Sequence, residues 1–366
     1  MSFGLARENR ENTMKKMLLA GVLALTTLLP ITAFAQVAGY NVIAIHGFGM
    51  EDYTVNPSYE EIVDAGKKHW DSPDQFWSDH YEAHMSWGSQ HRIENEEGGL
   101  GQIMKDVYKQ AEEISASHLC DAGCVIVSNS TGDLVTRYFL DTQNDVMKNP
   151  LNIVATLDFV GAGGGTELAD LAVSAVNNQE EEISSWLLTF IAGSVTGGTP
   201  TPENIGVLYD LQPTVARTLG TNFNNAVPRL RFSSDNGNGD IQGIYMLGNN
   251  DGVVPAHSSC GSVRNEAIDS CSDVLSYDGE MDDTRGPYAL MNNHFPIIMA
   301  YGLEHLEVNK KVAPEQDMTY VNSFAWFNDK IKTHVDEGFW WWSSDYLYIT
   351  GSADKSVPQV LFESVQ

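Results

Sequence analysis

Short apolar runs separated by polar segments recur along the chain after residue 41. Each run is four to eight residues long and is expected to form a strand buried on both faces, at residues 42–45, 124–127, 153–160 and 244–247. Between the runs, residues 103–117 have the spacing of an amphipathic helix, and residues 133–140 also predict a helix. Strands that alternate with helices predict an α/β fold with a doubly wound, mainly parallel sheet.

Residues 166–240, between the third and fourth predicted strands, lack this alternation and are interpreted as an inserted helical lid or cap. Five apolar residues in this insertion recur at intervals of three and four: Ile183, Trp186, Leu187, Phe190 and Ile191. Glutamates at residues 180–182 supply negative charge to the first turn of the helix, and glycines at residues 197–198 allow it to end. The stripe predicts either a helix packed on the core or a lid over an acyl-binding cleft.

The N-terminal segment predicts export. Residues 14–35 carry Lys15 and Lys16 ahead of an apolar run that ends in Ala-Phe-Ala, the pattern of a cleavable signal peptide. Threonines and a proline interrupt the run, which is short for the alternative, a membrane anchor. We therefore expect an upstream extension and signal peptide at residues 1–35, then one domain at residues 36–366 with a C-terminal extension from about residue 335, secreted or periplasmic.

Composition and charge exclude some partners. Hydrophobic residues make up 42% of the chain and charged residues 19%, as in an ordinary globular protein. The net charge is −28, and it becomes −30 without residues 1–35, which hold four basic and two acidic residues. Such a surface repels nucleic-acid phosphates and anionic membranes, so nucleic acid is not expected as a partner.

Four cysteines allow three pairings. Proximity in the sequence favours Cys120–Cys124 and Cys260–Cys271, each of which closes a small loop. An exported chain meets an oxidising compartment, and none of the cysteines lies in a metal-like array with histidines. We interpret all four as structural.

Ser130 is the candidate nucleophile. The segment VIVSNSTGDLVTRYFL places it between a predicted buried strand and a predicted helix, with Gly132 two residues later. Small neighbours are needed where strand and helix backbones approach at such a turn, and the usual pattern is G-x-S-x-G. Here Ser128 replaces the first glycine. Ser128 is the rival nucleophile, although no glycine follows it two residues later.

A serine hydroxyl needs a base, and the base needs an orienting carboxylate. Asp251, in the segment NNDGVVP, directly follows the fourth predicted strand, and His294 lies in a loop that enters an apolar run. The order Ser, Asp, His is the one that α/β-hydrolases use. Alone, Asp251 also fits a simple turn, because Asp-Gly favours turns, and His294 also fits an ordinary loop histidine.

The oxyanion of the tetrahedral intermediate requires preorganised donors. The backbone amide of Thr131, directly after the nucleophile, is one candidate, and the amide of Phe48 in the HGFG segment is the other. His46 is expected to brace this loop rather than to act as a base.

These residues resemble those of the secreted bacterial true lipases of the α/β-hydrolase superfamily, typified by pseudomonad enzymes. The resemblance extends over about residues 42–303 as an ordered series: HGFG from His46, the elbow followed by Arg137 and Tyr138, FVGAGGGTELADL from Phe159, DLQPTVARTLGTNFNNAVP from Asp210, NNDGVVPAHSSCGS from Asn249, and NHFPIIMAYGL from Asn293.

The resemblance implies an α/β-hydrolase fold and a triacylglycerol lipase or carboxylesterase acting on apolar acyl esters, with Ser130, Asp251 and His294 as triad and Phe48 and Thr131 as oxyanion donors. It also implies transient contact with a lipid interface and a secretion chaperone. Asp133, Gly163 and Gly164 depart from the family pattern, which has a glycine, a proline and a histidine at these positions. The resemblance also implies calcium, but the family's calcium site uses an acidic residue shortly after the histidine, whereas Phe-Pro-Ile follows His294. The site is therefore altered here, and no cofactor is expected.

Several alternatives stay open. The same triad serves a polyester depolymerase, an acyltransferase or an amidase, and a non-catalytic lipid-binding protein on a hydrolase scaffold is the rival from another class. His80, His84 and His91 with two nearby carboxylates suggest a metal site, but such residues are more often a solvated helix or loop, and no metal site is assigned. Three tryptophans at residues 340–342 have no family counterpart and are interpreted as packing of the C-terminal tail.

Overall fold

The protein is described from a computed structural model, in which the chain divides into two units, Met1–Phe34 and Ala35–Gln366. The description below concerns the second unit. It covers residues 36–37, 39–48, 57–178, 202, 205–221, 227–235, 245–246, 248, 250–264, 291, 294–301, 304–306, 308, 310, 318–320, 335–337 and 347–349.

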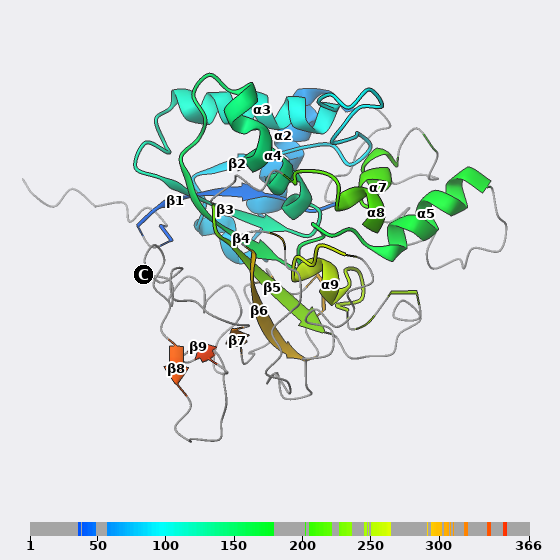
Figure 1. Cartoon of the computed structure of the whole chain (residues 1–366). Coiled ribbons are helices and arrows are strands. Elements are labelled where there is room, and N and C mark those ends of the chain that lie inside the picture. Colours follow the sequence, from blue (N-terminus) through cyan, green and yellow to red (C-terminus); the bar gives the residue numbers. More distant parts are fainter. Residues whose placement is uncertain are drawn as a thin grey trace, which may run out of the picture. The chain divides into compact units, whose positions relative to one another are not determined.

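A twisted sheet forms the centre of this unit (Figure 1). Its parallel part has the order β2-β1-β3-β4-β5-β6, with strands β2 Ala83–Met85, β1 Asn41–Ile45, β3 Cys124–Asn129, β4 Ile153–Phe159, β5 Arg229–Asp235 and β6 His294–Tyr301. Beyond β6 the order continues β7-β9-β8 through antiparallel pairs, with β7 Met318–Tyr320, β9 Leu347–Ile349 and β8 Val335–Glu337. Because all six inner strands are parallel, their carboxyl ends meet at one edge, where α/β folds bind their ligands.

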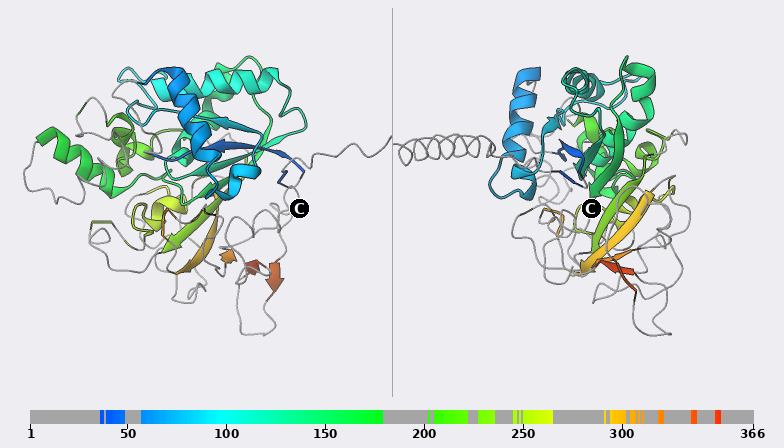
Figure 2. Two further views of the ribbon diagram at one scale, coloured as in Figure 1. Left: turned by 180° about the vertical axis from the view of Figure 1, so that it is seen from behind. Right: turned by 90° about the vertical axis from the view of Figure 1, so that its left-hand side faces the viewer.

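Helices cover both faces of the sheet (Figure 2). Alternate residues of β1 and β3 face opposite sides, as the strand period of two requires. Ile43 and Ile126 pack in one buried cluster with helices α3 Gln102–Ala116 and α4 Gly132–Val146. Val42 and Val125 belong to the other cluster, with Trp70 of helix α2 Tyr59–Trp70 and Trp77 of the 3₁₀ helix η1 Phe76–Asp79. The core is therefore split into two layers by the sheet.

Local sequence explains how α2 begins. Ser58 is its N-cap and accepts a hydrogen bond from the amide of Glu61, while the Glu61 carboxylate accepts one from the Ser58 amide. This reciprocal pair satisfies two backbone donors that the first turn of a helix leaves open.

The predicted strands at residues 42–45, 124–127 and 153–160 and the predicted helices at residues 103–117 and 133–140 are confirmed as β1, β3, β4, α3 and α4. The fourth predicted strand, at residues 244–247, is wrong, because Tyr245 lies in a turn and Met246 in a bend. The strand next to β4, on the side away from β3, is instead β5, which lies inside the segment interpreted as an insertion. Its arginines alternate with Leu230 and Phe232, so the sequence has the pattern of a half-exposed strand, although Arg229 and Arg231 are buried.

The segment predicted as a lid, residues 166–240, thus contains a sheet strand at its C-terminal end. The described helices of this segment are α5 Glu167–Asn178, α7 Gly206–Asp210 and α8 Pro213–Ala216. The five apolar lid candidates, residues 183, 186, 187, 190 and 191, lie outside the described residues, as do the predicted signal peptide at residues 14–35 and the tryptophans at residues 340–342. Within the described part of the chain, no helix has the length and apolarity needed to cross a membrane.

Candidate active site

Ser130 lies at the sharp turn between β3 and α4, at the carboxyl edge of the sheet. Its φ of 51° is in the left-handed region, which costs a non-glycine residue free energy and is typical of functional turns. The Ser130 amide donates to the Phe159 carbonyl over 3.0 Å. A Cβ at Gly132 would lie 2.6 Å from the His46 carbonyl oxygen, and one at Gly47 would lie 2.8 Å from the Ser130 Cβ. The close approach of the loop after β1 therefore requires glycine at both positions.

Asp251 is buried in the loop that follows β5 and is paired with a histidine, as a triad acid should be. Its Oδ1 accepts hydrogen bonds from the amides of Val253 and Val254, at 2.9 and 2.7 Å. Its Oδ2 lies 2.6 Å from Nδ1 of His305, which is also buried. The His305 amide donates to the Asp251 carbonyl over 3.2 Å, so backbone and side chain together fix the pair.

The structure pairs Asp251 with His305 and not with His294, the residue that the sequence predicted as base. His294 is the first residue of β6 and pairs with Arg229 of β5. Further along β6, Ile297 pairs with Phe232 of β5, which is in register through β4 with the last residue of β3. Measured along the strand direction, His294 therefore lies four residues, roughly 13 Å, before the level of Ser130. The His294 ring packs on Gly261, where a Cβ would lie 2.5 Å from its Cδ2.

A physical rule could have found His305 in the sequence. The apolar run after His294 is itself the last parallel strand, and a catalytic base belongs after the carboxyl end of its strand rather than before its start. His305 is the first histidine that follows this run.

The two predicted oxyanion donors lie on loops that meet at Ser130. Thr131 is the N-cap of α4 and is buried, and Phe48 packs partly buried against the core. Within the described part of the chain, neither backbone amide has a hydrogen-bond partner. Both amides stay predicted donors to an oxyanion.

His46 braces the loop after β1, as predicted. Its Nδ1 lies 2.8 Å from the Gly47 carbonyl oxygen, and its Nε2 accepts from the Trp87 amide over 3.2 Å, which assigns the proton to Nδ1. Its ring stacks on that of Trp87, with centroids 5.0 Å apart. Burial lowers the pKa of His46 to about 3, with His69 and His84 adding to the shift against the hydrogen bond to Gly47. The imidazole is neutral and structural.

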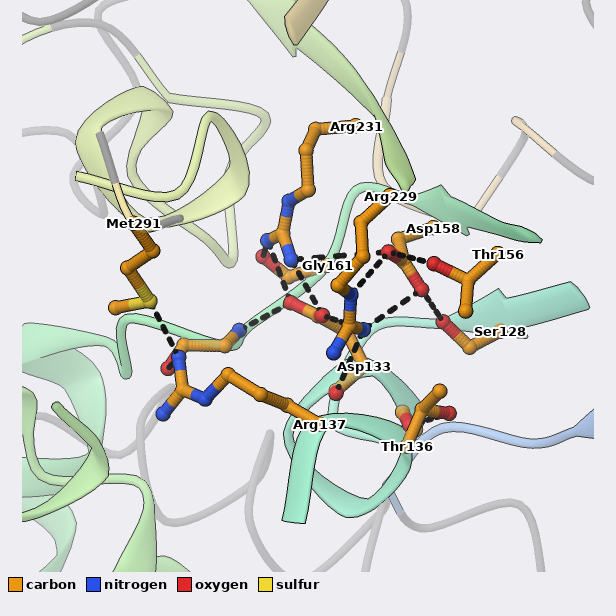
Figure 3. Close-up of polar contacts among 12 residues, drawn as sticks. Ser128, Asp133, Thr136, Arg137, Thr156, Asp158, Gly161, Arg229, Arg231 and Met291 are labelled. Carbon is orange, nitrogen blue, oxygen red and sulfur yellow. Dashed lines mark hydrogen bonds and ion pairs between the residues drawn. The ribbon is translucent and has the colours of Figure 1, made fainter. Parts of the chain in front are cut away.

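Two residues that differ from the motif of the lipases that the sequence resembles, Ser128 and Asp133, belong to one buried polar cluster (Figure 3). The Ser128 hydroxyl, in place of a glycine, donates to Asp158 over 2.6 Å. Asp158 is held by Arg229 through two contacts of 3.0 Å. Arg229 also contacts Asp133, the second departure, over 2.7 Å. Because its hydroxyl is committed to Asp158 inside the sheet, Ser128 does not fit the role of rival nucleophile.

The bridge Cys120–Cys124 is confirmed, and it ties the loop after α3 to the start of β3. The other predicted bridge, Cys260–Cys271, involves a residue outside the described part, so this pairing stays a prediction.

The histidines considered for a metal site have other contacts. His80 stacks on Phe76, and His84 lies 2.8 Å from the Ser86 hydroxyl. Among the described residues, no group of three or more His, Cys, Asp or Glu side chains is arranged to hold a metal ion. With His305 in place of His294, the acidic residue expected for calcium shortly after the histidine becomes Glu307, which lies outside the described residues.

Comparisons with known proteins give low similarity. No protein-family model and no curated protein matches the chain. Among solved structures, a metagenomic carboxyl esterase is 18% identical over 63% of each chain with a TM-score of 0.36. A mature Bacillus licheniformis lipase is 17% identical over 62% of this chain and 80% of its own, with a TM-score of 0.38. A Staphylococcus hyicus lipase is 13% identical over 74% and 88%, with a TM-score of 0.37.

Scores this low carry no functional argument. The α/β-hydrolase fold rests on this chain's own strand order, elbow and loops.

Proposed function

We propose that this protein is a serine carboxylic-ester hydrolase, a lipase or esterase, that acts through Ser130, His305 and Asp251. The observation that carries the proposal is the buried 2.6 Å contact between Asp251 Oδ2 and His305 Nδ1. This pair follows β5 and β6 at the sheet edge where the strained Ser130 follows β3. A nucleophile, a base and an orienting carboxylate thus follow three parallel strands of one sheet, in the chain order of α/β-hydrolases.

The first step forms an acyl-enzyme. The Ser130 hydroxyl attacks the ester carbonyl carbon while His305 Nε2 accepts its proton, because Nδ1 is committed to Asp251. Asp251 stabilises the resulting imidazolium and keeps its own negative charge. The amides of Phe48 and Thr131 donate to the oxyanion. As the tetrahedral intermediate collapses, the proton passes from His305 to the leaving alkoxide, and the alcohol departs.

The second step releases the acid. His305 takes a proton from water, whose oxygen attacks the acyl carbonyl through the same oxyanion site. The intermediate collapses, the proton returns to the Ser130 oxygen, and the carboxylic acid leaves.

Replacement of the nucleophile tests the proposal. We expect Ser130→Ala to lower kcat/KM for p-nitrophenyl butyrate by about 10⁴-fold or more, as for other triad members. A fluorophosphonate probe should label the wild-type protein and leave Ser130→Ala unlabelled. Ser128→Ala is the matched control, because Ser128 lies two residues before Ser130, within strand β3, and this variant should still be labelled. Wild-type activity of Ser130→Ala would contradict the proposal.

The substrate class proposed is an ester with an apolar acyl chain. Support comes from the apolar stripe at residues 183–191 and from Leu306, which is 62% exposed beside His305. A graded series of p-nitrophenyl esters from acetate to palmitate, with a polyester film and an amide in parallel, separates esterase, lipase, polyester depolymerase and amidase. A maximum at the amide would contradict the ester assignment.

Export is proposed with the function. Its support is the pattern of residues 14–35 and the Cys120–Cys124 bridge. N-terminal sequencing of protein recovered from a bacterial periplasm or medium should give Gln36 as the first residue. The secretion chaperone and the lipid-interface contact rest on the family resemblance alone.

A further inference from the structure

A buried ionic cluster joins Asp133 of α4 to Arg229 and Arg231 of β5 (Figure 3). Asp133, three residues after Ser130, is fully buried and faces the Arg231 guanidinium through both carboxylate oxygens, at 2.5 Å each. Arg229 adds a contact of 2.7 Å to the same carboxylate. The two arginines lie on the same face of β5, two residues apart, so one strand supplies both cations to one carboxylate of α4.

Asp133 holds together two strained turns. Ser130 has a φ of 51°, and Val160, at the end of the neighbouring strand β4, has a φ of 41°, an unfavourable value for a β-branched residue. The Ala162 amide donates to the Ser130 carbonyl over 2.8 Å, and the Gly163 amide donates to Asp133 Oδ2 over 2.6 Å. The loop after β4 is thus bonded to the elbow at both points.

Arg231 extends this connection to the loop that carries the acid. Its Nε donates to the Ser259 carbonyl over 2.9 Å, and one of its terminal nitrogens lies 3.2 Å from the Ser258 carbonyl. Both serines belong to helix α9 Ala256–Ser259, which begins directly after the turn that holds Asp251. A single guanidinium therefore bonds the elbow helix on one side and, on the other, the helix that directly follows the acid loop.

Glycines make room for this carboxylate. A Cβ at Gly163 would lie 2.4 Å from Asp133 Oδ2, and one at Gly161 would lie 2.5 Å from the same atom. The aspartate at residue 133 and the glycine at residue 163, both departures from the family pattern, are therefore mutually dependent. A buried ion pair is weak evidence for stability, since its desolvation offsets its attraction, so its occurrence here calls for another role.

We propose that Asp133 and Arg231 are positioning residues that set Ser130 relative to the Asp251–His305 pair. The inference rests on the proposed function, because it assumes that these three residues react together. Neither Asp133 nor Arg231 touches the substrate. Their effect is on the rate of the chemical steps, since a displacement of about 1 Å between reacting groups can cost about 100-fold in rate.

Asp133→Asn tests the role with Asp210→Asn as matched control. Asp210 is also a buried carboxylate that faces an arginine twice, with Arg92 at 2.9 and 2.7 Å, but it joins α7 to the loop before α3. We expect Asp133→Asn to lower kcat for p-nitrophenyl butyrate by about 10- to 100-fold. KM and the apparent pKa of the pH–rate profile should not change, because geometry and not titration is altered. Asp210→Asn should keep kcat although it also removes a buried ion pair and lowers thermal stability.

Arg231→Lys keeps the protein testable if Asp133→Asn does not fold, because lysine retains the charge but cannot bind two oxygens in one plane. A similar loss of kcat, with near-ultraviolet circular dichroism unchanged, supports the proposal. Wild-type kcat in folded Asp133→Asn or Arg231→Lys overturns it, provided that Ser130→Ala is inactive. If Ser130→Ala itself retains wild-type activity, the proposed function fails instead, so the two failures are distinguishable.

Discussion

Two buried polar regions flank Ser130, and they handle charge in opposite ways. Behind the elbow, Asp133 is ionised among arginines: burial alone would raise its pKa, but Arg231 and Arg229 overcome this and lower it to about 2. Beneath the oxyanion loop, His46 and His69 are neutral among aromatic rings, and burial lowers their pKa to about 3 and about 4. The first region is held by ion pairs, and the second by stacking and neutral hydrogen bonds.

The difference follows from what each region has to connect. The elbow helix, the loop after β4 and the acid loop present mainly carbonyls and amides to one another, and a branched guanidinium can bond several of them at once. The oxyanion loop has to be fixed while its outer amides stay open for substrate. A neutral imidazole does this, because His46 accepts on one side and donates on the other.

The largest expected effect is the loss of a cation behind the elbow. Arg231→Met leaves Asp133 with less compensation in a fully buried site, and we expect the free energy of unfolding to fall by about 3–5 kcal/mol. Urea denaturation followed by tryptophan fluorescence measures this. Arg92→Met is the control: its partner Asp210 is also buried, but the Arg92 side chain itself is 37% exposed, so its loss should cost less. Equal losses of unfolding free energy in the two variants would show that the cluster behind the elbow contributes no more than the Arg92–Asp210 pair.

Acid should weaken the imidazole region first. An imidazole with a folded pKa below 6.5 takes up its proton more readily when unfolded, so stability is fully present above pH 6.5 and is lost as pH falls toward about 4 for His69 and about 3 for His46. At pH 5, each of the two imidazoles should have lowered the free energy of unfolding by about 2 kcal/mol. The stability that ionised Asp133 contributes is lost only at lower pH, between about pH 4 and pH 2, because its pKa is lowered from 3.8.

Thermal melting between pH 7 and pH 4.5 measures this loss. His69→Leu should reduce the dependence of Tm on pH in that range, because it removes one titrating ring. Within the described residues, Nε2 of His69 has no hydrogen-bond partner to lose. A Tm that is constant over the range in the wild-type protein would show that the imidazoles do not carry the acid sensitivity.

The smallest expected effect tests the fit between Asp133 and its glycine neighbour. Gly163→Ala places a methyl group against Asp133 Oδ2, and we expect a loss of about 1–3 kcal/mol through crowding. In an Asp133→Gly background the methyl group has room, so the added cost of Gly163→Ala should disappear. Additive costs in this double-mutant cycle would mean that the two positions are independent.

The sequence predicted the alternation of strands and helices and the turn at Ser130, because these depend on local patterns of apolar and small residues. It did not predict β5, because Arg229 and Arg231 are charged, and only the tertiary contact with Asp133 and Asp158 makes their burial tolerable. The choice of His294 rather than His305 from the sequence has a related cause. Without β5 the register of the last parallel strand was unknown, and the histidine before that strand could not be told from the one after it.

We propose that His305, and not His294, is the base that accepts the proton of Ser130. The most direct test compares kcat/KM for p-nitrophenyl butyrate in His305→Ala and His294→Ala, each checked for folding by near-ultraviolet circular dichroism. We predict a loss of about 10³-fold or more for His305→Ala, because Ser130 then has no proton acceptor, and a loss of less than about tenfold for His294→Ala. Retained activity in His305→Ala together with an inactive, folded His294→Ala would contradict the account.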